Sequence, residues 1–207
     1  MPLKQFRHRL PRVDRRRYLA RLCRDRCVLH LGCMAHPDTA DHKRRGKLLH
    51  DHLHAVARVL IGVDLDVTTN RELLPADSAT HWLWQANVET GGTLQTAAVS
   101  PAGDVVVPEV IVAAEILEHL TSPGLALSNL RRCFGVARLV VTVPNAFASI
   151  RLPKLRRGIE EVNPDHVAWY SPQTLTALLD RHGWTVRRLF AYRGKGLQAP
   201  GIVAEAT

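Results

Sequence analysis

The chain has 207 residues and a mass of 23.1 kDa, which suits one domain and is too short for two ordinary ones. Hydrophobic residues make up 46% and charged residues 23%, a composition that excludes a disordered or low-complexity protein. No apolar run approaches the ~18 residues of a membrane span. No apolar stretch of the secretory type follows the Arg-rich N-terminus either, so we expect a cytoplasmic protein.

The net charge of +9 is concentrated at the N-terminus. Residues 1–26 hold ten Lys and Arg against two Asp, a net charge of +8. We therefore predict a basic helical arm over 1–26 and a nearly neutral domain over 27–207. Basic arms contact phosphates, but this one has only Phe6 and Tyr18 as aromatic side chains, so nucleic acid is the less favoured partner. A solvated helix face that caps the sheet or pairs with a second subunit in a homodimer is favoured instead.

Apolar spacing predicts a series of alternating strands and helices. Residues 14–26 have helical periodicity, with Asp14 positioned to cap the helix. Ser-Pro pairs begin two later helices, and Gly183 ends the last of them. These two helices are 122–134 and 171–184, and a further helix is predicted over 48–60. The predicted strands are 27–33, 61–66, 81–89, 109–117, 137–145, 185–194 and 197–206.

This alternation predicts an α/β fold with a mostly parallel sheet, helices on both faces and a C-terminal antiparallel hairpin. Parallel sheets of this kind bind ligands beyond the carboxyl ends of their strands. Gly32 stands at one such end and permits a close backbone approach to a ligand. Asp64 stands at the next and is suited to a ribose diol.

The order LHLGC, GVDLD, EVIVAAEILEHL, SPGLALSNLRRCF and ARLVVTVPN resembles the class I S-adenosylmethionine-dependent methyltransferases. The resemblance covers about residues 27–190 and is closest to the small-molecule branch that includes sugar O-methyltransferases. AEILEHLTSPGLALSNLRRCF is its most specific part. It implies a Rossmann-like seven-stranded fold, S-adenosylmethionine as cofactor, and a small-molecule or oligosaccharide acceptor, such as a mannoside in polysaccharide biosynthesis.

The resemblance also implies roles for the residues at the strand ends. Those expected to bind the cofactor are Leu31, Gly32 and Cys33 at its amino-acid end, Asp64 at the ribose, Asn87 and Val88 near the adenine, and Glu115 beside the methionine part. The first loop departs from the family's Gly-rich pattern, because Cys33 and Met34 follow Gly32 directly. We expect the long segment 34–47 to act as a lid.

Methyl transfer to a hydroxyl requires alignment of the acceptor and removal of its proton. Histidine suits the second task because its pKa lies near operating pH. His119 is the first candidate for a general base and His166 the second, with Asp165 expected to orient the base or the acceptor. On the acceptor side, along the connection 146–170 and the lid, the expected contacts are His36, Glu118 and Tyr170.

A metal site is left open. His50, His52 and His54 lie close together in the sequence, but no established zinc motif contains them, and an exposed helix face is the favoured interpretation. Mg²⁺ prefers carboxylates, and Asp165 with Glu118 or Glu115 would supply them. The alternative functions are methylation of another small metabolite or of RNA, and a non-catalytic nucleic-acid-binding module that uses the basic arm.

Overall fold

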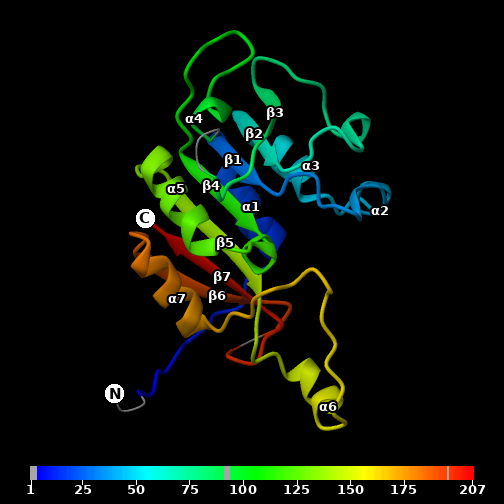
Figure 1. Ribbon diagram of the computed structural model, residues 1–207, viewed down its shortest axis with the longest axis vertical. Coiled ribbons are helices and arrows are strands. Elements are labelled where there is room, and N and C mark those ends of the chain that lie inside the picture. The colour runs from blue at the N-terminus through cyan, green and yellow to red at the C-terminus, as the bar shows by residue number, and fades with distance from the viewer. Residues whose placement is uncertain (1–3, 91–93, 195) are drawn as a thin grey trace.

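A computed structural model describes residues 4–90, 94–194 and 196–207 and contains one seven-stranded sheet (Figure 1). Its strand order is β3-β2-β1-β4-β5-β7-β6. The strands β1 to β5 pair in parallel, whereas β7 runs antiparallel to both β5 and β6. The strands are β1 Cys27–Leu31, β2 Val59–Asp64, β3 His81–Gln85, β4 Val110–Ala114, β5 Arg138–Pro144, β6 Val186–Tyr192 and β7 Gly201–Ala206. The predicted mostly parallel sheet with a C-terminal hairpin is confirmed.

Helices cover both faces of this sheet. On one face, α1 and α3 pack over β1, β2 and β4. On the other face lie α4, α5 and α7, of which α7 packs against β6 and β7. The α-helices are α1 Arg15–Cys23, α2 Thr39–Arg44, α3 Leu49–His54, α4 Leu94–Ala97, α5 Pro123–Phe134, α6 Leu152–Leu155 and α7 Pro172–Arg181; short 3-10 turns are η1 Arg71–Leu73, η2 Leu117–His119 and η3 Ser149–Arg151. No helix among these described residues is long and apolar enough to cross a bilayer.

The coverage of both faces explains why the central strands are apolar throughout. Successive side chains of a strand point to opposite faces. Val28 therefore lies in the core cluster that contains the α1 and α3 side chains, while its neighbour Leu29 lies in the larger cluster on the opposite face, which contains those of α4 and α5. All five residues of β1 are buried. A continuous apolar run is the expected signature of such a strand.

The N-terminal segment lies against the sheet. Asp14 caps α1 by accepting a hydrogen bond from the Arg17 backbone N–H at 3.0 Å. Tyr18 on α1 is buried, and its hydroxyl donates to Glu205 of β7 at 2.5 Å. Just before α1, the Val13 backbone N–H donates to the Ala191 carbonyl of the edge strand β6 at 2.9 Å. These contacts attach the segment to one face and one edge of the sheet.

Four features differ from the predicted elements. The predicted helix 48–60 ends early, because Val59 and Leu60 pair with β1 and begin β2. The predicted lid contains a short helix, α2, and the linking segment 90–104 contains α4, although its residues 91–93 lie outside the described residues. Ser122 precedes α5 as expected, but its side chain makes no capping hydrogen bond.

The interpretation of the α3 histidines as an exposed face is wrong for His50, whose side chain is 0% exposed. Its Nδ1 lies 3.1 Å from His30 Nδ1, and its Nε2 lies 2.9 Å from His81 Nε2. The spacing of α3 turns His50 toward the sheet, where the two strand histidines supply the polar partners that a buried imidazole needs. These three residues are called the histidine chain below.

Candidate active site

The loop after β1 brings Gly32 and Asp64 together at the carboxyl end of the sheet. Gly32 has φ +68°, a left-handed conformation that favours glycine, and its N–H donates to the Val63 carbonyl at 2.8 Å. One oxygen of Asp64 accepts from the Met34 N–H at 2.9 Å and the other from the Leu65 N–H at 2.8 Å. Burial raises the pKa of Asp64, and these backbone donors oppose that shift. The Asp64 carboxylate therefore holds the loop after β1 in place through its hydrogen bond with Met34.

Leu31 and Cys33 flank Gly32, and both side chains are buried. Leu31 packs in the large core cluster on the α5 side of the sheet, and Cys33 packs with Met34 and residues of the neighbouring loops. Burial raises the pKa of the Cys33 thiol. A ligand at this loop therefore meets the backbone around Gly32 rather than these two side chains.

The segment after β3 forms a tight turn stabilised by α5. The Asn87 side-chain oxygen accepts from the Glu89 backbone N–H at 2.8 Å. The Asn129 side-chain amide of α5 donates to the carbonyls of Val88 and Glu89, both at 3.0 Å. Val88 is buried and Asn87 is half-buried. His36, in the loop beyond Gly32, faces the Asp66 carbonyl with its Nε2 at 3.1 Å, so it lies at the tip of β2.

Glu115 follows β4 in a strained backbone conformation, with φ +55°. Its Oε1 accepts hydrogen bonds from the Tyr192 hydroxyl at 2.7 Å and from the Thr142 hydroxyl at 2.9 Å. Arg15 of α1 adds an ion pair to the same oxygen at 3.5 Å. The arm therefore reaches a candidate site residue, a contact that sequence analysis missed because Arg15 is one of many arginines in the arm.

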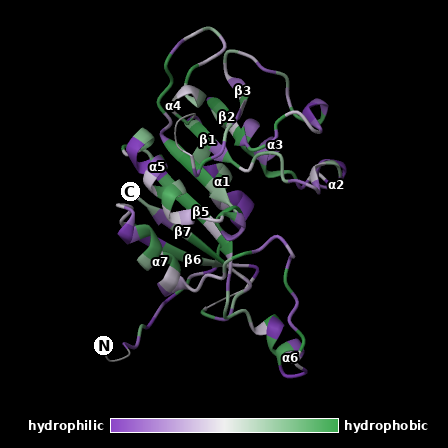
Figure 2. Cartoon of the chain, viewed as in Figure 1, coloured by the Kyte–Doolittle hydropathy of each residue, from purple (hydrophilic) through white to green (hydrophobic). Residues whose placement is uncertain are grey.

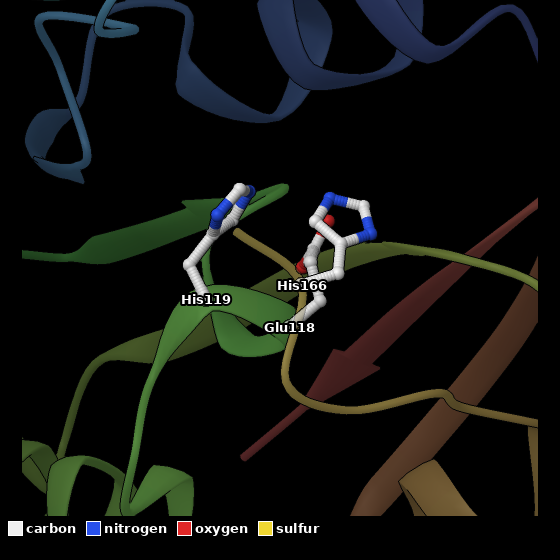
Figure 3. Close-up of side chains that lie close together, drawn as sticks. All are labelled: Glu118, His119 and His166. Carbon is white, nitrogen blue, oxygen red and sulfur yellow. The ribbon is translucent and has the colours of Figure 1, made fainter. Parts of the chain in front are cut away.

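Glu118, His119 and His166 form a compact cluster beyond β4 (Figure 3). One ligand atom of each lies within 4.8 Å of the others, and the two imidazole rings meet edge to face with centroids 4.6 Å apart. A hydrogen bond from the Val167 N–H to the Glu118 carbonyl, 2.8 Å long, joins the two segments. The structure thus brings together two predicted base candidates and one predicted acceptor contact.

The electrostatics of this cluster are unusual. Glu118 is 1% exposed, and neither carboxylate oxygen has a hydrogen-bond partner among the described residues. Burial, reinforced by repulsion from Glu115, raises the pKa of Glu118 to about 8. His166 Nδ1 is also buried without a partner in this part of the chain, and burial lowers the pKa of His166. A buried carboxylate without donors requires a proton or a cation.

Asp165 and Tyr170 lie outside this cluster. Asp165 is exposed, and its backbone N–H donates to the Asn163 side chain at 3.1 Å. Tyr170 is buried, and its hydroxyl donates to the Leu117 carbonyl at 3.2 Å. Tyr170 therefore supports the turn that carries Glu118.

A cavity of about 240 Å³ adjoins the cluster through Trp169, whose ring centroid is 6.1 Å from that of His166. The Arg151 guanidinium lies 3.9 Å from the centroid of the Trp169 ring. Lys154, Leu155 and Ile159 complete the mixed apolar and charged wall. The acceptor side is predicted along 146–170, but these wall residues could not be predicted individually, because no periodicity indicates how the segment folds.

Comparison with known proteins now identifies the family. A family model described as a methyltransferase domain matches residues 3–189, most of the chain. The chain belongs to the class I S-adenosylmethionine-dependent methyltransferases. It is therefore an enzyme that uses S-adenosylmethionine as methyl donor. No curated protein sequence matches it.

Solved structures of methyltransferases share the fold at low sequence identity. Magnesium protoporphyrin IX methyltransferase from Synechocystis PCC 6803, with bound S-adenosylhomocysteine, has a TM-score of 0.59 at 12% identity, with 93% of this chain and 81% of that chain covered. The N-methyltransferase NodS from Bradyrhizobium japonicum WM9 has a TM-score of 0.56 at 16% identity, with 93% of this chain and 84% of that chain covered. The small RNA methyltransferase HEN1 has a TM-score of 0.65 at 16% identity, with 93% of this chain and 24% of that much longer chain covered.

Proposed function

We propose that this methyltransferase acts on a hydroxyl group of a sugar or glycan, and that Glu118, His119 and His166 prepare that hydroxyl for attack. In the reaction, the acceptor oxygen bonds to the methyl carbon, the carbon–sulfur bond of the sulfonium breaks, and the hydroxyl proton leaves. Mannosides are the first acceptors to try, from the resemblance in the sequence. We assign the cofactor to the strand-end residues named above, with Asp64 on the ribose hydroxyls.

The observation that carries the proposal is the buried carboxylate of Glu118, which lies beside two imidazoles and has no hydrogen-bond partner among the residues that the structure describes. A carboxylate and two neutral imidazoles are a familiar ligand set for a divalent cation, with positions left open for a substrate. A bound cation would neutralise Glu118, and it would lower the pKa of a coordinated hydroxyl so that its proton is lost near neutral pH. Two nitrogen ligands favour a transition metal such as Mn²⁺ over Mg²⁺, which prefers oxygen ligands throughout.

A histidine acting alone as general base is the alternative use of the same residues. In that arrangement His119, which is exposed at the surface of the cluster, takes the hydroxyl proton directly. Chelation distinguishes the two arrangements. If a cation activates the hydroxyl, removal of metal abolishes turnover and added Mn²⁺ restores it. If histidine acts alone, turnover is unchanged by chelator.

The experiment measures methyl transfer from S-adenosylmethionine to mannosides and other sugars, before and after metal removal. Glu118→Gln keeps the size of the side chain and removes its charge, so we expect turnover to fall by about 10²–10⁴ while S-adenosylhomocysteine binding persists. Glu72→Gln, on an exposed turn outside the cluster, is the matched control and keeps full activity. Cofactor binding without methylation of any sugar would refute the acceptor assignment.

RNA is the second candidate acceptor, and the basic arm favours it. A ribose hydroxyl is also a sugar hydroxyl, so the same cluster would serve. HEN1 is described as a small RNA methyltransferase, and the methyltransferase domain of a bacterial Hen1 also shares the fold, with a TM-score of 0.57 at 14% identity over 92% of this chain and 94% of that one. Methyl transfer to an RNA oligonucleotide, but not to free sugars, would select this candidate.

A further inference from the structure

The exposed apolar side chains of the protein are concentrated in one segment. Fourteen large apolar side chains are exposed among the described residues, and seven of them lie between residues 147 and 167. Ile150 is 72% exposed, Val167 66% and Phe147 55%. Figure 1 shows this segment, with α6, extending away from the rest of the molecule. In Figure 2, apolar and polar residues are interspersed along it. Such a concentration marks an interaction surface.

The N-terminal segment extends this surface. Phe6, which is 51% exposed, lines a second cavity of about 230 Å³ together with Phe147 and Leu197. The Ser149 backbone N–H also donates to the Gln198 carbonyl at 3.1 Å, which fixes the segment to the loop before β7. Residues 4–12, 147–167 and 197 therefore contribute to one surface, called the apolar–basic surface below.

This surface carries a net positive charge. Residues 4–12 and 147–167 contain eight Lys and Arg against three acidic side chains, a net charge of +5. Arg156 and Arg157 are exposed and make no ion pair within the part of the chain that the structure describes. A second copy of the chain would present the same positive charge, so the surface disfavours contact with itself.

We propose that the apolar–basic surface binds peripherally to an anionic lipid bilayer. Exposed apolar side chains such as Ile150 and Phe147 would enter the interface between headgroups and acyl chains, while the basic side chains attract the anionic headgroups. Each Lys or Arg near such a surface strengthens binding about fivefold, and the attraction weakens with salt. The combination of apolar and basic groups on one surface therefore matches this partner in both respects.

The surface adjoins the Glu118 cluster, because Val167 directly follows His166, whose ring centroid lies 6.1 Å from that of Trp169 in the wall of the 240 Å³ cavity. A sugar carried by a membrane lipid would meet the cluster there. That consequence rests on the proposed function, whereas binding to vesicles does not. The experiment therefore measures vesicle binding without any acceptor, and its failure leaves the methylation proposal untouched.

The full chain is sedimented with vesicles of phosphatidylcholine and with an equal mixture of phosphatidylcholine and phosphatidylglycerol. We expect at least about tenfold stronger binding to the anionic vesicles, weakening as salt is raised. Ile150→Ser/Phe147→Ser removes two of the inserted side chains and lowers binding by about tenfold or more. The matched control Val105→Ser/Val136→Ser replaces two apolar residues that are 76% and 88% exposed outside this surface, and it binds as the wild type does.

Arg156→Glu/Arg157→Glu tests the electrostatic part and is expected to abolish the preference for anionic vesicles. Retained binding of S-adenosylhomocysteine shows that each variant is folded. Equal binding to neutral and anionic vesicles, no binding to either, or equal loss in the Val105/Val136 control would overturn the proposal. So would a dimer, detected by analytical ultracentrifugation, that the Ile150/Phe147 variant dissociates, because a second copy would then occupy the surface.

Discussion

The histidine chain predicts a specific loss of stability in mild acid. His30 and His50 are 2% and 0% exposed, and burial lowers the pKa of both, that of His30 to about 3. His81 Nδ1 faces the Ala76 carbonyl at 3.1 Å, so it must donate, and His81 Nε2 must accept. His50 then donates from Nε2 and accepts at Nδ1, where His30 donates. Since His30 donates from Nδ1, an added proton would go to its Nε2 and leave a positive charge buried in the core.

The magnitude follows from the pKa difference of His30. In the unfolded chain a histidine titrates near pH 6.5, whereas in the folded protein the pKa of His30 is about 3. Below about pH 6.5 the unfolded state therefore binds a proton that the folded state does not, and stability falls as pH falls. The loss is about 1.4 kcal/mol per pH unit, or roughly 2 kcal/mol between about pH 6.5 and 5. Arg15 lies near enough to His30 to add to this effect.

The assay is urea unfolding at several pH values across that window, comparing wild type with His30→Gln. Glutamine keeps a donor and an acceptor but does not titrate, so the pH slope of its unfolding free energy differs from that of the wild type by about 1.4 kcal/mol per pH unit. The comparison is needed because Glu118, with its raised pKa, contributes with the opposite sign in both proteins. Leu53→Ala, equally buried on α3, costs about 2–5 kcal/mol at every pH and keeps the wild-type slope. Identical slopes in His30→Gln and wild type would refute the reasoning.

Three further predictions concern the cofactor loop and the fold. Asp64→Ala should weaken S-adenosylhomocysteine binding by roughly 1–3 kcal/mol in calorimetry, and unchanged affinity would remove Asp64 from the ribose role. Gly62→Ala would place a Cβ 2.5 Å from Leu83 Cδ2 and 2.9 Å from Cys33 Sγ, so urea unfolding should show a loss of about 1–3 kcal/mol; wild-type stability would mean that these side chains move aside. Ser171→Ala removes the cap of α7 and should cost about 1 kcal/mol in thermal unfolding, whereas no loss would show that the cap is replaceable.

The sheet was predictable because its strands are buried on both faces and therefore read as uninterrupted apolar runs. The boundaries of the individual strands were less predictable. Val59 and Leu60 continue the helical spacing of α3, and only their pairing with Cys27 and Val28 of β1 assigns them to a strand. Local periodicity cannot represent a pairing between segments more than 30 residues apart.

Part of the candidate site was predictable for a topological reason. Parallel strands end at the same edge of the sheet, so residues such as Gly32, Asp64 and Glu115 are placed together by strand order alone. The contacts of those residues were not predictable. The ion pair of Glu115 with Arg15 depends on where α1 packs, and the burial of His50 depends on which face of α3 meets the sheet. Both are properties of tertiary packing.

Glu118 shows most clearly what packing adds to the sequence. Its burial requires the return of the chain at Val167, which lies 49 positions further along and donates a backbone hydrogen bond to it. If the position served only the core, an apolar residue of similar volume would avoid the cost of burying a carboxylate, which reaches several kcal/mol for an uncompensated charge. The same return of the chain that buries Glu118 also delivers His166 beside it and opposite His119. A buried carboxylate beside two imidazoles is a set of ligands that a cation requires and that a hydrophobic core does not, and for this reason we propose this cluster as the place where the acceptor reacts.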